Sequence, residues 1–167
     1  MASTGWLIRR LSAADVRDYR AIRLATLELE PDFFGSLHSS EVKRPVEDFA
    51  KVIAGVSVFG AYVDERIVGV VRLHAEAGVK ERHKASLHGF FVLPEHRGKG
   101  VGRQLMQSAI ELAQASFEQL TLSVVEGNKQ AISMYERYGF KRYGLEPRAR
   151  KFDGIYTDIV LMVLQFR

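Results

Sequence analysis

The stretch that decides the fold runs from Leu87 to Ala115 and reads LHGFFVLPEHRGKGVGRQLMQSAIELAQA. An apolar segment is followed by a turn of glycine and basic residues, and this turn opens into a helix-forming segment. The three glycines, Gly98, Gly100 and Gly102, lack the Cβ atoms that would hold a ligand away from the backbone N–H groups. Because a helix N-terminus carries a partial positive charge, the pattern predicts an anion site at this turn.

The composition of the 167-residue chain fits one folded domain, residues 1–167. Hydrophobic residues make up 47% and charged residues 26%, with no apolar run long enough to cross a bilayer, so we expect a cytoplasmic protein without a membrane partner. The absence of cysteine excludes disulfides and a cysteine acyl-enzyme. A net charge of +4 spread along the chain argues against a nucleic-acid partner.

Periodicity and turn residues predict a mixed α/β chain. Asp64 and Glu65 are expected to form a tight hairpin turn, and Gly144 and Gly154 are expected to mark later turns. The expected strands are 6–11, 56–63, 66–74, 85–93, 120–125, 140–143 and 155–166. The expected helices lie between Ser12 and Pro31 and at 45–54, 101–117 and 128–138. The strands 85–93 and 120–125 should be parallel, because a helix connects them in a right-handed crossover.

Spacing separates three interpretations of the glycine turn. A Walker phosphate loop needs Lys-Ser or Lys-Thr after its last glycine, whereas Arg103 follows Gly102 here. A dinucleotide-binding turn needs its third glycine one position later and normally follows the first strand, whereas this turn follows the fourth expected strand. Neither of these two classes fits the residues.

The residues resemble instead two signatures of the Gcn5-related N-acetyltransferase (GNAT) superfamily. Its pyrophosphate loop stands here as Arg97-Gly98-Lys99-Gly100-Val101-Gly102. Its second signature appears as Asn128, Ala131, Tyr135, Gly139 and Phe140. The resemblance covers about residues 56–140 and reaches the ends only by the order of elements. It implies a mixed sheet of six to seven strands, splayed between its two parallel strands, with about four helices.

The resemblance also implies that acetyl-CoA is the acetyl donor. No metal is expected, because the chain has no cysteine and the spacing of His74, His83 and His96 forms no metal site. Backbone groups on the central strand would bind the pantetheine arm and polarise the acetyl carbonyl. The glycine turn and its basic residues would bind the pyrophosphate, and the helix at 128–138 would contact the arm. The implied coenzyme-binding residues are Phe90, Phe91, Val92, Arg97, Gly98, Lys99, Gly100, Val101, Gly102, Arg103, Asn128, Ala131 and Tyr135.

Two residues are candidates for proton transfer. Tyr135 resembles the family's general acid, and a phenol with a pKa near ~10 is protonated at neutral pH. His88 shares one strand face with Ser86, Phe90 and Val92 by the period of two, which would point it toward the acetyl group. Arylalkylamine acetyltransferases of the superfamily carry a histidine at the matching place. His88 is therefore a candidate base, acting directly or replaced by a water chain, and the alternative is a hydrogen-bonded core histidine.

The acceptor is the least determined part of the prediction. Phe33 and Phe34 either line an acceptor pocket or cover the core, and Arg148 and Tyr156 either bind the acceptor or belong to a charged hairpin. The expected function is transfer of the acetyl group of acetyl-CoA to a primary amine of a small molecule or peptide, by direct attack in a ternary complex. The alternative is a non-catalytic module that senses acetyl-CoA. The oligomeric state stays open, and the resemblance allows a homodimer.

Overall fold

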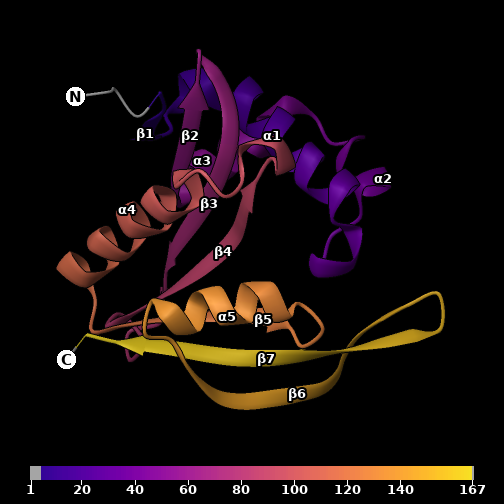
Figure 1. Cartoon of the computed structure of the whole chain (residues 1–167), viewed down its shortest axis with the longest axis vertical. Coiled ribbons are helices and arrows are strands. Elements are labelled where there is room, and N and C mark those ends of the chain that lie inside the picture. Colours follow the sequence, from indigo (N-terminus) through magenta and orange to yellow (C-terminus); the bar gives the residue numbers. More distant parts are fainter. Residues whose placement is uncertain (1–4, 167) are drawn as a thin grey trace.

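A computed structural model describes residues 5–166 and shows one seven-stranded mixed sheet within them (Figure 1). The strand order is β1-β2-β3-β4-β5-β7-β6, and only β4 and β5 pair in parallel. The predicted mixed sheet and its parallel pair are thus confirmed. The strands are β1 (Leu7–Arg10), β2 (Ser57–Val63), β3 (Arg66–Ala75), β4 (Lys84–Val92), β5 (Gln119–Val125), β6 (Lys141–Phe152) and β7 (Ile155–Gln165).

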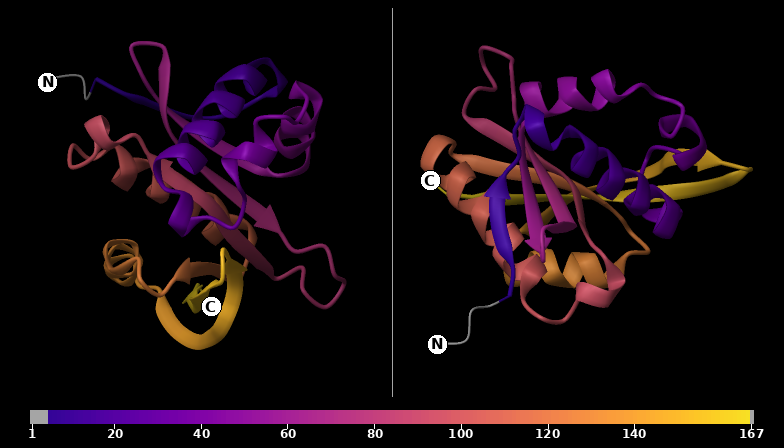
Figure 2. Two further views of the ribbon diagram at one scale, coloured as in Figure 1. Left: turned by 90° about the vertical axis from the view of Figure 1, so that its right-hand side faces the viewer. Right: turned by 90° about the horizontal axis from the view of Figure 1, so that it is seen from above.

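Five α-helices lie within residues 5–166: α1 (Val16–Leu29), α2 (His38–Glu41), α3 (Val46–Gly55), α4 (Val101–Ser116) and α5 (Lys129–Arg137). α1 and α3 lie on one side of β2 and β3, and α4 lies on the other side (Figure 2, left). About four helices were predicted. The additional one, α2, is a single turn in a segment too short to show a helical period.

Two short sequence features determine local structure. Asp64 and Glu65 both have positive φ, 46° and 65°, as a two-residue hairpin turn between antiparallel strands requires. Asp15 accepts a hydrogen bond from the Ser12 backbone N–H at 2.7 Å and completes a capping box. This box begins a short 3-10 turn that continues into α1.

The central strands β4 and β5 stay paired over only three residue pairs, which are Lys84 with Gln119, Ala85 with Leu120 and Ser86 with Thr121. Beyond these pairs β4 continues with β1 to β3, while β5 stays with β7 and β6, so the two strands diverge (Figure 1). The predicted splay of the sheet is therefore confirmed. Its consequence is that the later backbone N–H and C=O groups of β4 face β5 without a strand partner.

A β-bulge in β4 corrects one sequence expectation. β3 residue Val71 lies opposite both Gly89 and Phe90, because the register shifts between the pairs Arg72–His88 and Val70–Phe91. Gly89 has a φ of +63°, which favours glycine. The extra residue reverses the sheet face to which each later β4 side chain points, so His88 shares its face with Phe91. The prediction that His88, Phe90 and Val92 share a face was wrong.

Strand β6 also differs from its prediction. It runs from Lys141 to Phe152 rather than over 140–143, and Gly144 lies inside it at an irregularity in the pairing with β7. The outer half of this hairpin reaches beyond the rest of the sheet (Figure 2, right). Its residues are mostly exposed, so no alternation of apolar and polar residues marked them as a strand. The turn at Gly154, with a φ of +78°, is where it was expected.

Candidate functional site

A cleft of about 1040 Å³ opens where β4 and β5 separate. It is lined by the glycine turn and the start of α4, by β4, β5 and α5, and by the segment after α1 together with Arg150 of β6. Most predicted site residues line it: Phe33, Phe34, His88, Phe90, Phe91, Val92, Arg97, Gly98, Gly100, Gly102, Arg103, Asn128, Ala131 and Tyr135. The splay thus brings together residues from distant parts of the chain.

The glycine turn lines this cleft and has the backbone geometry of an anion site. Gly98 and Gly100 have φ values of +73° and +99°, and Gly100 is the N-cap of α4. The first N–H groups of the helix therefore have no intrahelical partner and can bind an anion. A Cβ atom at Gly102 would lie 3.3 Å from the Phe90 ring, so glycine permits this close approach of helix and strand. Arg103 adds positive charge beside the turn.

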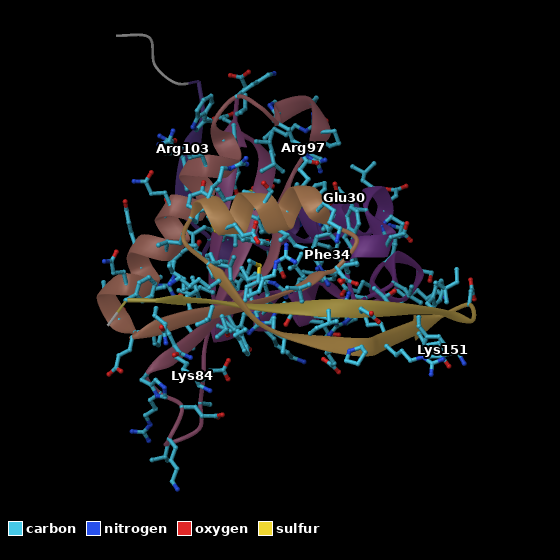
Figure 3. All side chains as sticks on the ribbon, turned by 60° about the horizontal axis from the view of Figure 1, so that its bottom comes forward. Glu30, Phe34, Lys84, Arg97, Arg103 and Lys151 are labelled. Carbon is cyan, nitrogen blue, oxygen red and sulfur yellow. The ribbon has the colours of Figure 1, made fainter. Side chains whose placement is uncertain are left out.

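Arg97 connects the turn to the far side of the cleft. Its Nε donates to the Val92 carbonyl at 2.7 Å, and its Nη2 donates to Oε1 of Glu30 at 2.6 Å. The guanidinium also lies over the Phe91 ring, 5.4 Å from its centroid. Figure 3 shows Arg97, Glu30 and Phe34 following one another beside α5. Arg97 therefore holds the end of α1 against the glycine turn.

Two predicted residues of the turn lie outside the cleft lining. The Lys99 ammonium donates to the Glu95 carbonyl at 2.9 Å, away from the cleft. The Val101 side chain is 1% exposed and belongs to the core. Val101 can contribute its backbone N–H at the helix start, whereas Lys99 contributes charge at longer range.

On β4, His88 begins a chain of hydrogen bonds that leads out of the cleft. Its Nε2 lies 2.9 Å from Oγ of Ser86, and this hydroxyl donates to Oε1 of Glu76 at 3.0 Å. Because an ionised carboxylate only accepts, the single hydroxyl proton of Ser86 goes to Glu76. The Ser86 oxygen then accepts the Nε2–H of His88, which leaves Nδ1 as the basic nitrogen.

The surroundings of His88 make it a weak base. Partial burial, with the nearby His74 and Arg72, lowers its pKa to about 4, so the imidazole is neutral at pH 7. An imidazole with a lowered pKa is a poor acceptor for the proton of an alkylammonium with a pKa of ~10. His88 is therefore better suited to guide a proton from an amine that arrives neutral than to deprotonate an ammonium ion.

Helix α5 presents two predicted residues to the cleft. Asn128 caps the helix, since its Oδ1 accepts the Ala131 N–H at 3.3 Å, and its amide NH₂ remains a donor. Tyr135 is 8% exposed and packs edge-on against Phe140 at 5.8 Å. Burial raises the pKa of the Tyr135 phenol above its ordinary value. The phenol is therefore protonated at neutral pH, as a general acid must be.

The predicted acceptor residues divide into two groups. Phe33 and Phe34 line the cleft and follow Glu30, which is hydrogen-bonded to Arg97. Arg148 and Tyr156 stack on each other at 3.9 Å and lie outside the cleft lining. Arg148 also donates its backbone N–H to Oδ1 of Asp158 at 2.7 Å. In this structure the second pair stabilises the outer hairpin.

Sequence reasoning missed several residues that line the cleft, above all Arg23, Arg72 and Arg150. One signal was present for Arg72, a charge within the apolar run of β3, whereas Arg150 follows the part of β6 that was predicted to be a turn. Tyr138 was also missed; its hydroxyl donates to the Arg103 carbonyl at 3.3 Å and joins α5 to α4.

Among residues 5–166 we find no cluster of three metal-ligating side chains. No helix of that range is long and apolar enough to span a membrane.

A sheet opened between two parallel strands, with a glycine turn before a helix and a buried phenol beside the opening, is an arrangement suited to a long ligand with a phosphate end. Comparison with known families names the class. The chain belongs to the acetyltransferase (GNAT) family, whose model matches residues 23–140. This confirms the predicted superfamily, whose members are acetyl-CoA-dependent acyltransferases.

Individual relatives are similar over different lengths. An L-methionine sulfoximine/L-methionine sulfone acetyltransferase of Pseudomonas aeruginosa is 35% identical over 78 residues, which are 46% of this chain and 45% of that protein. The match thus spans less than half of that relative. A peptidyl-lysine N-acetyltransferase, YjaB of Salmonella typhimurium, is 28% identical over 82% of this chain and 84% of its own. The crystal structure of a GNAT acetyltransferase from Streptococcus pneumoniae superposes with a TM-score of 0.85 at 25% identity, covering 97% of this chain and 99% of that one.

Proposed function

We propose that the protein is an N-acetyltransferase that transfers the acetyl group of acetyl-CoA to a primary amine by direct attack in a ternary complex. The observation that carries this proposal is the separation of β4 and β5, which joins the glycine turn to Tyr135 in one cleft. Acetyl-CoA supplies the reactive thioester. Family membership supports the donor, and the absence of cysteine supports direct attack rather than a cysteine-bound intermediate.

The residues along the cleft fit the coenzyme from end to end. The turn from Gly98 to Arg103 would bind the pyrophosphate through backbone N–H groups and positive charge. A Cβ atom at Gly98 would meet nothing within 4 Å, so the backbone there is open to a ligand. The backbone of Phe90 to Val92, which has no partner strand on its β5 side, would bind the pantetheine arm as an added strand would, with Asn128 donating from α5.

Two groups would move protons. Tyr135, protonated and buried, would give a proton to the leaving sulfur. The path from His88 through Ser86 to Glu76 would take the proton of the amine toward the surface. A water chain is the second route for that proton, and mutation of His88 separates the two.

The experiment that tests the function is the release of free coenzyme A thiol from acetyl-CoA in the presence of a panel of primary amines. We expect amine-dependent release well above the background hydrolysis without amine. A protein that binds acetyl-CoA but releases no thiol with any amine would be the sensor module instead.

Intersecting lines in initial-velocity plots support a ternary complex, and parallel lines or an acetylated enzyme contradict it. The names of the relatives allow both amino-acid-like and peptidyl-lysine acceptors.

We expect Gly98→Ala to weaken acetyl-CoA binding about tenfold, because a methyl group and a strained positive φ disturb the N–H groups that bind phosphate. Gly154→Ala is the matched control: its φ of +78° is close to the +73° of Gly98, and its Cβ would also meet nothing within 4 Å. Both variants should lose similar stability in thermal unfolding, but only Gly98→Ala should raise the Kd for acetyl-CoA in calorimetry. Equal Kd values in the two variants would remove the turn from the binding site.

We expect His88→Gln to lower kcat about tenfold, a modest effect because a base with a low pKa contributes little driving force. The basic form of His88 is lost as the pH falls through about 4, so its limb in the pH profile of kcat/KM lies there. Between pH 6 and 8 the profile should instead rise tenfold per unit, as the acceptor amine loses its proton. An unchanged kcat for His88→Gln across pH 5 to 8 would assign the proton to a water chain.

A further inference from the structure

The cleft end away from the glycine turn carries more positive charge than its own side chains neutralise. Three arginines line it, Arg23 from α1, Arg72 from β3 and Arg150 from β6. Only Arg23 is paired with a carboxylate there: its Nε and Nη2 bind Glu41 at 3.0 and 2.9 Å, in a bidentate pair with both residues 8% exposed. Within residues 5–166, Arg72 and Arg150 make no ion pair within 4.0 Å.

Arg150 is held in place with a donor unused. A Cβ atom at Gly35 would lie 3.2 Å from its Cζ, so the guanidinium packs directly on the backbone of the segment that follows α1. Its Nη1 is buried and has no hydrogen-bond partner in the part of the chain that the structure describes. A buried donor without an acceptor costs free energy, and a ligand that accepts from it recovers that cost.

Arg72 is likewise ordered but weakly bound. Its Nη1 donates to the Tyr19 hydroxyl over a long 3.4 Å, which uses one of five N–H donors. It lies beside His88 in the strand register, and a Cβ atom at Gly89 would lie 3.1 Å from its Nε. The glycine of the β4 bulge therefore makes room for this guanidinium next to the proposed proton path. Burial lowers the pKa of Arg72, yet an arginine stays charged at neutral pH.

We propose that Arg72 and Arg150 form an anion subsite, so that the acceptor is a primary amine that also carries a carboxylate, such as an amino acid. This rests on the proposed acetyltransferase function and names its substrate class. A guanidinium fork pairs with a planar carboxylate through two parallel hydrogen bonds. A carboxylate at this end would satisfy the free donor of Arg150 and offset the two unpaired charges.

The same charges disfavour the other acceptors. A polyamine brings further positive charge next to two unpaired arginines, and like charges in a poorly solvated cleft repel. A lysine side chain within a peptide offers an amine but no carboxylate near it. Both classes are outcomes that the experiment distinguishes.

The test uses matched acceptors: a panel of L-amino acids of different side-chain size, each with its amide, and the decarboxylated amine where one exists. L-leucine, L-leucinamide and isoamylamine form one such set. Rates are compared per neutral amine, because the three amines have different pKa values. We expect at least a tenfold higher kcat/KM for the best acid than for its amide. Equal or faster acetylation of the amide or the plain amine across the panel overturns the inference and leaves the acetyltransferase function standing.

Variants locate the effect on the two arginines. Arg150→Gln and Arg72→Gln should each raise KM for the acid about tenfold or more and leave KM for the amide nearly unchanged. Arg142→Gln is the control, because Arg142 is an exposed residue of the same strand β6 that pairs with Glu136 at 3.1 Å outside the cleft. A loss that is equal for acid and amide would show a structural role and contradict the subsite.

A binding measurement separates failure of this inference from failure of the proposed function. Calorimetry on the full chain loaded with coenzyme A compares the Kd of each acid with that of its amide and needs no turnover. Tighter binding of acids, lost in Arg150→Gln, supports the subsite even if no amine is acetylated, a result that would refute only the enzyme function. Acids that bind no tighter than amides, or no binding by any member of the panel, overturn the subsite.

Discussion

Tyr135→Phe is expected to lower kcat by about 10²-fold or more, because it removes the proton donor proposed for the leaving sulfur. The fold should not change, since the Tyr135 ring packs against Phe140 through its edge and the structure shows no hydrogen bond of its hydroxyl within residues 5–166. Burial raises the pKa of this phenol, so the proton is present across the neutral range. Steady-state kinetics with saturating acetyl-CoA measure the effect, and the Kd for acetyl-CoA should stay within a factor of about three of the wild-type value.

Tyr138→Phe is the matched control for this prediction. Tyr138 is the C-cap residue of the same helix and lines the same cleft, but its hydroxyl donates to the Arg103 carbonyl and so already has a structural partner. Its loss should cost about 1 kcal/mol of stability, as removal of one hydrogen bond does, with a much smaller effect on kcat. Equal kcat values for Tyr135→Phe and the wild type would remove Tyr135 from the acid role.

Glu41→Ala is expected to lower the free energy of unfolding by about 3–5 kcal/mol, because it leaves the buried Arg23 charge without its partner. Both side chains are 10% exposed and share two hydrogen bonds, so water cannot easily replace the carboxylate. The loss would also add a third unpaired arginine to the cleft wall. Urea unfolding followed by circular dichroism measures the change, with an unchanged m-value as the sign of two-state behaviour.

The double variant Arg23→Met with Glu41→Leu tests the cause of that loss. If the unpaired charge is responsible, the double variant should recover most of the stability, since an apolar pair often replaces a buried ion pair at little cost. Burial acts to raise the pKa of Glu41, but its bonds with Arg23 lower the pKa overall. The pair therefore stabilises fully above the ordinary pKa of a glutamate and less as the pH falls, so the double variant should lose less stability in acid. A double variant as unstable as Glu41→Ala would contradict this explanation.

The coenzyme end of the cleft was predictable because its residues are contiguous. In the glycine turn, each residue's role follows from its neighbours. The glycines leave the backbone N–H groups accessible, basic residues surround them, and a helix begins directly after the turn. The second motif behaves in the same way, since Asn128 and Tyr135 lie on one helix and share a face by helical periodicity alone. Chain connectivity also determined that β4 and β5 are parallel.

Expectations that depended on long uninterrupted periods were less reliable. One inserted residue at Gly89 reversed the facing of the rest of β4, and nothing in the local pattern distinguishes a bulge from a regular strand glycine. The outer half of β6 carries no alternation because neither of its faces is buried, so only its pairing with β7 defines it as a strand. In both cases the partner strand decided the outcome.

By itself, then, the sequence determined the kind of acetyl donor. A local glycine turn and a local helix motif predict a protein that binds a coenzyme with a phosphate end. Only the tertiary structure decided what lies at the other end of the cleft. Arg23, Arg72 and Arg150 come from a helix, a central strand and an edge hairpin. Arg23 and Arg150 have the sequence pattern of solvated surface charges, and the position of Arg72 within an apolar run does not tell what it contacts. Packing partly removes them from water and pairs Arg23 with Glu41, while Arg72 and Arg150 have no ion-pair partner within residues 5–166. The partners of a side chain depend on register and contacts that sequence spacing does not contain.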